Sequence, residues 1–340
     1  MSTAVLSKRN IMAFEENEIS INSQGGTESV KRGLAERLDS SFTDDFQIIC
    51  SRVRKIEEDK IRVYWLHDLP EDPETNHLKD QSSRDRFHKL VFCGNWQYSR
   101  YQLVCGIPYD DQATVIDTPI DPAPSVVKEF DTIRLVYSST PQRGLSILVP
   151  VFEELSKKYK NIHLDVFSSF KIYGWEEADK QFEPLYERIR NHPQMTYHGF
   201  ASNDLVRETL LKAHIHAYPS IWLECNSRSV IEAMSSGLWC VHPNFGGLVD
   251  TSGGMNFMYQ GHNNLNRHAS IFYEALDHAI TNVHTEQIQS YLKLVKLYAD
   301  SRYAWARIKA QWEDLLGNLK LKYNTVESRK LPGEKFIYET

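Results

Sequence analysis

Short runs of apolar and β-branched residues alternate with longer stretches in which apolar residues recur every three or four positions. The short runs predict buried β-strands, and the longer stretches predict amphipathic helices. Alternation of this kind is typical of parallel sheets whose strands are joined by crossover helices. The strands are expected at 10–14, 46–50, 61–66, 89–93, 113–116, 133–137, 162–167, 195–197, 215–218 and 239–241.

Helical spacing fills most of the intervals between these strands. The helices are expected at 27–38, 73–86, 95–105, 145–158, 176–191, 203–212, 227–236, 265–281 and 285–299. A further helix is expected at 305–319, where Trp305, Ile308, Trp312 and Leu316 fall on one face that is meant to be buried.

A proline-rich segment, Asp117-Thr-Pro-Ile-Asp-Pro-Ala-Pro, interrupts the alternation near the middle of the chain. Proline disrupts both helices and strands, so this segment is interpreted as the link between two domains. Each half reads as a doubly wound α/β unit, and ligands of such sheets bind at the carboxyl ends of the strands. Two units facing each other would place the ligand in the cleft between them.

Composition narrows the function classes. The chain has 340 residues, 41% of them hydrophobic, which suits two domains with real cores. It shows no apolar run of membrane-spanning length and no signal-peptide core, and its five cysteines form no CxxC pair, so a cytoplasmic protein with reduced thiols is expected. The formal charge of −6 argues against broad affinity for DNA, although a local basic groove stays open as an alternative.

The most informative stretch contains two acidic residues, Glu224 and Glu232, eight positions apart. Asn226 or Ser227 is expected to cap the helix that carries Glu232, and the free N–H groups at such a helix end suit a phosphate, with Arg228 adding charge. A carboxylate accepts both donors of a vicinal diol, as in a sugar or a ribose. The alternative is that Glu224 is exposed and that Glu232 pairs with an arginine.

Other candidates follow strands and precede helices. Gly25 and Gly26 allow a backbone to approach a phosphate, or form a plain turn capped by Thr27. Arg143 stands where a guanidinium can clamp a diphosphate, or is a solvated arginine. His67 ends a strand and is placed to touch a substrate, although a lone His-Asp pair is more often structural. Neither HExxH nor Asp-x-Asp occurs, so no metal site is expected.

Taken in order, these motifs resemble the GT-B superfamily, and within it the retaining nucleotide-sugar glycosyltransferases of the family 4 type, which carry two glutamates separated by seven residues. The resemblance spans about residues 11–319, and its strongest part ends in Glu-Ala-Met-Ser-Ser-Gly at Gly237. Supporting matches are Gly25-Gly26-Thr27-Glu28, His67, the segment 91–96, Arg143-Gly144 and Gly246-Gly247.

The resemblance implies a GT-B fold of the α/β class, with two Rossmann-like domains facing a central cleft. It implies an acceptor domain at 1–125, a donor domain at 126–299, a helix at 300–320 that crosses back to the first domain, and a charged tail at 321–340. The implied roles are sugar binding for Glu224, ribose binding for Glu232, diphosphate contacts for Gly25, Gly26, Asn226, Ser227, Arg228 and Arg143, proximity to the transferred sugar for His67, and nucleobase contacts for Gly199 and Phe200.

The expected reaction is transfer of a hexose or pentose from a nucleoside diphosphate sugar to a hydroxyl acceptor, with retention and without a metal or other cofactor. One departure is Ser138, which stands where the family usually has a second basic residue, and Arg228 is hypothesised to compensate. The acceptor stays open among a glycan or lipid-linked sugar, a small molecule, a protein and a modified base in DNA. A nucleotide-sugar epimerase and a non-catalytic sugar-nucleotide binding protein are the rival classes. The basic residues available for DNA are Arg52, Arg54, Lys55, Arg84, Arg86 and Lys89.

Overall fold

The computed structural model describes residues 25–42 and 44–331. The chain divides into two compact units, which are described separately: unit 1 comprises 1–119 with 305–340, and unit 2 comprises 120–304. The strand expected at 10–14 and the last part of the expected tail, 332–340, lie outside the described residues.

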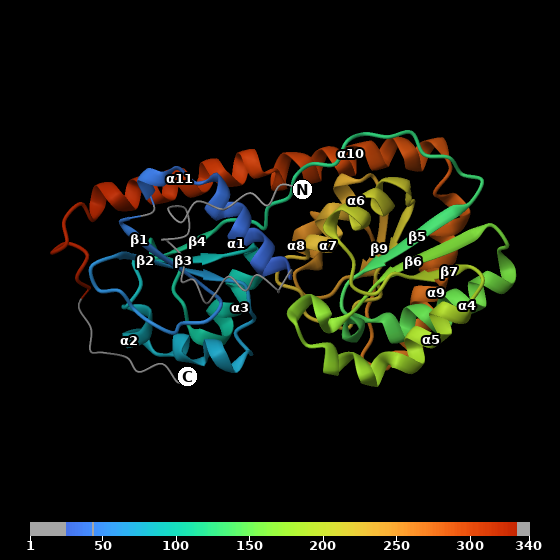
Figure 1. The fold of residues 1–340 in the computed structure, drawn as a ribbon, viewed down its shortest axis with the longest axis horizontal. Coiled ribbons are helices and arrows are strands. Elements are labelled where there is room, and N and C mark those ends of the chain that lie inside the picture. The colour runs from blue at the N-terminus through green and yellow to red at the C-terminus, as the bar shows by residue number, and fades with distance from the viewer. Residues whose placement is uncertain (1–24, 43, 332–340) are drawn as a thin grey trace, which may run out of the picture. The chain divides into compact units, whose positions relative to one another are not determined.

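Unit 1 is built on a parallel sheet in the order β1-β2-β3-β4 (Figure 1). Its strands are β1 (Phe46–Cys50), β2 (Ile61–Leu66), β3 (Lys89–Phe92) and β4 (Ala113–Val115). Successive side chains of a strand point to opposite faces, and both faces of β2 are covered. Trp65 therefore belongs to one apolar cluster and Tyr64 to another. This double burial explains why the strands read as continuous apolar runs.

Two helices from opposite ends of the chain cover one face of this sheet. They are α1 (Gly26–Arg37) and α11 (Trp305–Lys322), and both contribute to the cluster that contains Trp65. The ring centroids of Trp65 and Trp312 lie 4.9 Å apart. The other face is covered by α3 (Asn95–Cys105) and by the segment before β3. The apolar spacing at 305–319 is thus satisfied within unit 1.

Two expected helices are each broken into two pieces. The segment 73–86 forms a 3-10 helix, η4 (Pro73–Lys79), and a short α2 (Gln81–Arg84), because Asp80 ends the first and caps the second by accepting from the N–H of Ser82. The segment 176–191 forms η7 (Glu176–Phe182) and α5 (Glu183–Asn191). Pro184 stands in the first turn of α5, where its missing N–H costs nothing, so a new helix begins there.

Unit 2 is built on a parallel sheet in the order β10-β9-β8-β5-β6-β7. Its strands are β5 (Ile133–Ser138), β6 (Ile162–Phe167), β7 (Met195–Tyr197), β8 (Ile215–Ala217), β9 (Trp239–Pro243) and β10 (Phe257–Tyr259). Figure 1 shows α4, α5 and α9 on one face of this sheet and α6, α7 and α10 on the other. These helices are α4 (Leu145–Lys158), α6 (Asn203–Lys212), α7 (Arg228–Ser235), α9 (Leu265–Asn282) and α10 (Glu286–Tyr303), with α5 bounded above.

The elements of unit 2 that the sequence does not predict include β10 and α8 (Leu248–Ser252). Both are too short for a period of two or of 3.6 to emerge from the pattern. β10 forms by pairing in parallel with β9, with Phe257 opposite Val241, and it is the edge strand of the sheet.

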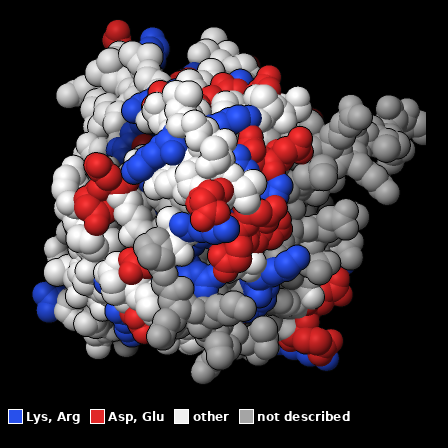
Figure 2. Space-filling view, turned by 90° about the vertical axis from the view of Figure 1, so that its left-hand side faces the viewer, with Lys and Arg blue, Asp and Glu red and all other residues white. Residues whose placement is uncertain are grey.

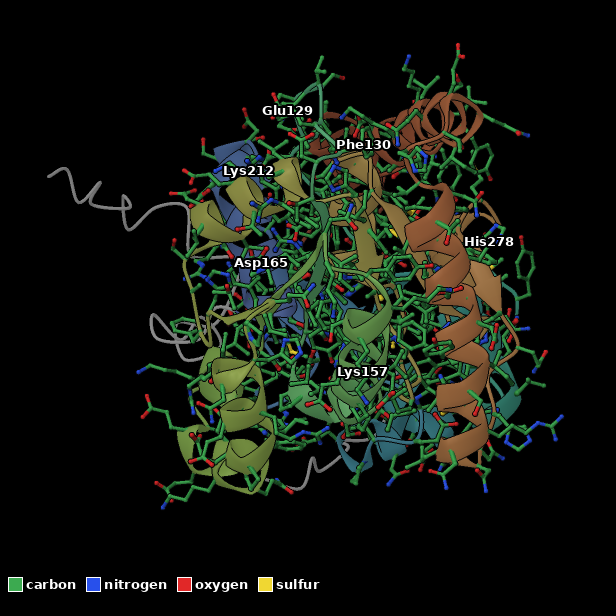
Figure 3. All side chains as sticks on the ribbon, turned by 90° about the vertical axis from the view of Figure 1, so that its right-hand side faces the viewer. Glu129, Phe130, Lys157, Asp165, Lys212 and His278 are labelled. Carbon is green, nitrogen blue, oxygen red and sulfur yellow. The ribbon has the colours of Figure 1, made fainter. Side chains whose placement is uncertain are left out.

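The part of the linker that begins at Ile120 is held against unit 2. The N–H of Ile120 donates to the carbonyl of Tyr303 over 2.8 Å. The carbonyl of Glu129 lies 2.9 Å from Nε2 of His214, and the ring of Phe130 lies 4.7 Å from the ring of His214; Figure 3 labels Glu129 and Phe130.

Across the described ranges, every helix is too short or too polar to span a lipid bilayer. All five cysteines are free, and only Cys225 is more than slightly accessible. Within the same ranges, no group of three or more His, Cys, Asp or Glu side chains is arranged to hold a metal ion.

Candidate functional site

Three side chains of unit 2 meet at the carboxyl edge of the sheet. β5 pairs directly with β8, so the loops that follow these strands are neighbours. Nη1 of Arg143 donates to Oε1 of Glu224 over 2.6 Å, and the hydroxyl of Tyr218 donates to the same oxygen. Oε2 of Glu224 has no hydrogen-bond partner among the described residues. The cluster therefore holds one carboxylate oxygen and leaves the other available to a ligand.

Glu224 is buried, which contradicts the interpretation that it is exposed: only 6% of its surface is accessible. A buried carboxylate is tolerated only when it is paired and hydrogen-bonded. Burial by itself would lower the pKa of Arg143. The charge of Glu224 and the neighbouring Tyr218 outweigh this effect and raise the pKa above its usual value, so the guanidinium stays charged. Burial, and then the charge of Glu224, raise the pKa of Tyr218, so its phenol stays protonated.

Tyr218 was not among the residues chosen from the sequence. The signal was present, because a tyrosine at the carboxyl end of a buried strand has its ring in the core and its hydroxyl at the ligand-binding edge. In the strand predicted at 215–218, Tyr218 is the last residue.

Glycines bring the loops of this site into contact with one another. Gly144 has φ +131°, and a Cβ there would lie 2.2 Å from the carbonyl oxygen of Pro219. A Cβ on Gly247 would lie 2.3 Å from the carbonyl oxygen of Cys225, and the N–H of Gly247 donates to the carbonyl of Glu224 over 2.7 Å. The Gly246-Gly247 loop therefore packs closely against the backbone that carries Glu224.

The first turn of α7 has no side-chain cap. Ser227 occupies the N-cap position, but its side chain makes no capping bond, contrary to the expectation for this residue or Asn226. The amide oxygen and nitrogen of the Asn226 side chain are both buried, and no hydrogen-bond partner exists for them among the described residues. Buried polar atoms are normally satisfied, so the unpaired amide beside an uncapped helix end favours a bound polar group.

Arg228 and Glu232 pair with each other along α7. Nε of Arg228 donates to Oε1 of Glu232 over 3.0 Å, one helical turn apart. This is the alternative in which Glu232 pairs with an arginine. Oε2 of Glu232 has no partner in the described part of the chain, and the carboxylate is 24% exposed. The pair therefore still presents one carboxylate oxygen at the surface.

Gly199 and Phe200 follow β7 at the same edge of the sheet. Gly199 has φ +60°, the left-handed region that favours glycine, and its carbonyl accepts from the N–H of Ser168 over 3.1 Å. The hydroxyl of Tyr197 donates to the carbonyl of Ser168 over 2.8 Å. These bonds tie the loop after β7 to the loop after β6, and Phe200 is left half-buried.

The remaining candidates belong to unit 1. Gly25 is the N-cap of α1, so Thr27 lies inside the helix and does not cap it. Gly26 is exposed, and a Cβ there would meet nothing among the described residues. An uncapped helix start without side-chain obstruction is compatible with an anion, and the phosphate role of Gly25 and Gly26 stays a prediction.

His67 lies just beyond the carboxyl end of β2, with its ring 4.5 Å from the ring of Trp65. Burial, and then the charge of Lys31, lower the pKa of His67 to about 3, so the imidazole is neutral at neutral pH. Its Nε2 is buried and has no hydrogen-bond partner among the described residues. The Gln97 side chain donates to the carbonyls of Leu66 and Asp68 and so fixes the backbone on both sides of His67. The role of His67 beside a transferred sugar stays a prediction.

Three of the basic residues considered for DNA binding, Arg54, Arg84 and Arg86, are engaged within unit 1. Arg84 is 7% exposed and donates to the carbonyls of Leu78 and Cys105, while Arg86 is 5% exposed and pairs with Glu58. Arg54 pairs with Glu74 over 3.2 Å. Figure 2 shows Lys and Arg side chains interspersed with Asp and Glu side chains across the face that it displays. These positions do not form the continuous basic stripe that DNA affinity would need.

Comparison with known proteins matches part of the chain to a family. Residues 121–253 match the family described as Glycosyl transferases group 1. The gpi3 subunit of phosphatidylinositol N-acetylglucosaminyltransferase from Schizosaccharomyces pombe is 24% identical over 123 residues, which are 36% of this chain. The alignment covers 25% of that relative's own length.

Solved structures resemble the whole fold. A glycosyltransferase from Rickettsia africae superposes with a TM-score of 0.63 at 14% identity, covering 88% of this chain and 83% of the other. Anabaena HepE in complex with UDP-glucose gives 0.57 at 15% identity, covering 76% and 72%. Sucrose-phosphate synthase from Thermosynechococcus elongatus gives 0.60 at 13% identity, covering 77% and 68%. The α/β fold of the chain is therefore that of the GT-B glycosyltransferases, as the sequence predicted.

Proposed function

We propose that this protein is a retaining glycosyltransferase that moves a hexose or pentose from a nucleoside diphosphate sugar to a hydroxyl acceptor. The observation that carries the proposal is the buried cluster of Arg143, Tyr218 and Glu224 beside the uncapped start of α7. The family match of residues 121–253 includes every member of that cluster and supports the same activity.

The proposed donor contacts follow from the free polar atoms. Oε2 of Glu224 accepts hydroxyl groups of the donor sugar, and Arg143 and Tyr218 keep the carboxylate oriented. Oε2 of Glu232 accepts the ribose hydroxyls, while Arg228 orients that carboxylate through Oε1. Gly199 and Phe200 lie at the same sheet edge and face the nucleobase in this proposal.

The leaving diphosphate requires preorganised positive potential. Arg143 supplies a guanidinium, and the first-turn N–H groups of α7 supply oriented dipoles. Asn226 adds a side-chain amide without a partner among the described residues. Because Arg143 already pairs with Glu224, the helix end carries more of this task than the sequence alone suggested.

Retention is proposed through front-face attack, in which the departing phosphate accepts the proton of the acceptor hydroxyl. Both carboxylates of the site are held by arginine, which makes either a weak nucleophile and disfavours a double displacement. The proposed mechanism assigns no step to a metal ion or another cofactor.

A thermal-shift series with UDP, GDP, ADP and their sugars tests the proposal, since a ligand that binds the folded state raises its stability by mass action. The Anabaena neighbour was solved with UDP-glucose, so UDP is the first nucleotide to test. We expect one base series to raise the Tm of the wild type and not that of the Asn226→Ala variant at the same concentration. If no nucleotide shifts the Tm at millimolar concentration, the proposed function is wrong.

A further inference from the structure

The chain crosses between the two units at two places that lie side by side. It enters unit 2 between Pro119 and Ile120, and it leaves between Ala304 and Trp305. The N–H of Ile120 donates to the carbonyl of Tyr303 over 2.8 Å, and a parallel β-bridge joins Ile120 to Ala304. The segments that enter and leave unit 2 are therefore paired with each other through their backbones.

Tyr303, the last residue of α10, also reaches α8. It is fully buried, and its hydroxyl donates to the carbonyl of Thr251 over 2.7 Å. The preceding residue, Arg302, donates to the carbonyl and to the carboxylate of Asp250 over 3.0 and 3.2 Å. The end of α10, where the chain leaves unit 2, is thus fixed to two consecutive residues of α8.

Thr251 connects α8 to two parts of the proposed donor site. Its hydroxyl donates to the carbonyl of Gly247 over 2.8 Å and accepts from the N–H of Ser227, the N-cap of α7, over 3.4 Å. The N–H of Gly247 in turn donates to the carbonyl of Glu224 over 2.7 Å. Thr251, which is fully buried, is therefore linked to the start of α7, to the loop that carries Glu224 and to Tyr303.

The bonds of Thr251 fix these segments against one another. A buried donor or acceptor that loses its partner costs the full desolvation of that group, so the arrangement in which every bond is made is strongly preferred. Thr251 has one O–H to donate, which Gly247 accepts, and it has lone pairs that accept from Ser227. In an active site, a displacement of about 1 Å can slow the reaction by about a hundredfold. The start of α7 and the loop of Glu224 therefore depend on where Tyr303 holds Thr251.

We propose that Thr251 and Tyr303 are positioning residues for the donor: they hold the start of α7 and the loop of Glu224, and they tie both to the chain crossing at Ile120. This inference rests on the proposed function and adds two residues that act on the same site through others. Their side chains position the groups that bind the diphosphate and do not themselves contact it in this proposal. Because linked equilibria are reciprocal, a diphosphate bound at the start of α7 should stabilise the bond between Ile120 and Tyr303.

Tyr291 offers a comparison on the same helix. Its hydroxyl donates to the carbonyl of Met255 over 2.7 Å, the same kind of bond at the same length as that of Tyr303. Met255 follows α8 in the chain and precedes β10. Tyr291→Phe therefore removes a tyrosine–carbonyl bond from α10 and keeps the bonds of Thr251, which makes it a matched control for Tyr303→Phe.

The test measures the binding of UDP, or of whichever nucleotide raises the Tm, to the full chain by isothermal titration calorimetry. It also measures hydrogen exchange of the Ile120 amide with and without the nucleotide. The variants are Tyr303→Phe and Thr251→Val, which remove one hydroxyl each, and Thr251→Ser, which keeps the hydroxyl. Tyr303→Phe retains the backbone carbonyl to which Ile120 donates. The Tm of each variant without ligand shows that it is folded.

We expect Tyr303→Phe and Thr251→Val each to weaken nucleotide binding by about fivefold or more, while Thr251→Ser and Tyr291→Phe stay close to the wild type. The nucleotide should slow exchange of the Ile120 amide by about threefold or more in the wild type and in Tyr291→Phe, and much less in Tyr303→Phe. A hydroxyl with a purely structural role would lower the Tm without removing this protection. The inference is overturned if Tyr303→Phe binds the nucleotide and protects Ile120 as the wild type does, or if Thr251→Ser loses as much affinity as Thr251→Val. If no nucleotide binds the wild type, the proposed function fails, and the positioning role fails with it.

Discussion

Arg143 and Glu224 are 81 positions apart in the chain, yet Nη1 of Arg143 lies 2.6 Å from Oε1 of Glu224. The pair follows two strands, β5 and β8, that are adjacent in the sheet and not in the sequence. The glutamate is almost fully buried and the guanidinium side chain is 23% exposed. Arg143, which the sequence assigned to a diphosphate, is thus the ion-pair partner of Glu224, the carboxylate proposed to bind the donor sugar.

Replacing Arg143 should show how much its ion pair with Glu224 contributes to the stability of the protein. Arg143→Ala leaves a buried carboxylate without its cation, and we expect the free energy of unfolding to fall by about 3 kcal/mol. Adding Glu224→Gln should restore part of the loss, because the amide carries no charge. Urea denaturation measures both. Arg188→Ala, which breaks the exposed pair with Glu153, should cost less than about 1 kcal/mol; equal losses at the two sites would contradict the argument.

Tyr218→Phe should separate activity from stability. The change removes the hydroxyl that orients Glu224 and leaves the ring in the core, so kcat/KM for the donor should fall by about tenfold or more. Release of the nucleoside diphosphate measures it. The control is Tyr259→Phe in β10, which breaks a buried hydrogen bond between Tyr259 and His268. If both variants keep wild-type kinetics, the orienting role of Tyr218 is wrong.

Arg228 and Glu232 should act as one unit. We expect Arg228→Ala and Glu232→Gln each to raise the donor KM by more than about tenfold, and the double variant to be little worse than either, because the arginine orients the carboxylate. With a donor that lacks the ribose 2′-hydroxyl, Glu232→Gln should raise the donor KM less than it does with the normal donor.

The matched control is Lys309→Ala, which breaks a similar one-turn pair with Glu313 on α11 of unit 1. Additive effects of Arg228→Ala and Glu232→Gln would mean that Arg228 contacts the donor directly, as the sequence hypothesis has it.

Gly144→Ala should be far more damaging than an alanine at another left-handed glycine. The new Cβ would meet the carbonyl oxygen of Pro219, and we expect a loss of at least about 3 kcal/mol. Gly106→Ala, at φ +65° with open space around it, should cost about 1 kcal/mol. Thermal unfolding compares the two, and a Gly144→Ala protein as stable as Gly106→Ala would show that the loops after β5 and β8 can separate freely.

His216 should make the protein sensitive to acid. Both ring nitrogens are buried without a partner among the described residues, and burial lowers the pKa to about 3. Its unfolded value is about 6.5, so below that pH the unfolded state binds the proton that the folded state excludes. His216 therefore leaves stability independent of pH above about pH 6.5, and it makes stability fall as the pH drops from about 6.5 towards 3.

His216→Leu should therefore raise the stability at pH 8 by about 1–3 kcal/mol and raise it more at pH 5. Thermal unfolding at both pH values measures the difference. His284→Leu, at an exposed position, should leave the pH dependence unchanged. A parallel shift of His216→Leu at both pH values would show that the ring takes no part in acid sensitivity.

The longer strands, such as 61–66, could be predicted because they are buried and mostly apolar. The long helices followed from spacing, as at 145–158. The sequence erred where a local break overrode the spacing, at Asp80 and at Pro184, and it missed β10, which exists only through pairing with β9.

The sequence by itself determined the alternating α/β architecture and the residue types available at each strand end, since these depend on local periodicity and turn chemistry. Only the tertiary structure decided the pairing of those residues. It joined Arg143 and Tyr218 to Glu224, and it packed Gly246 and Gly247 against the backbone that carries Glu224. The physical reason is that sheet order, and not chain order, sets which strand ends are neighbours, and side-chain pairing is settled there.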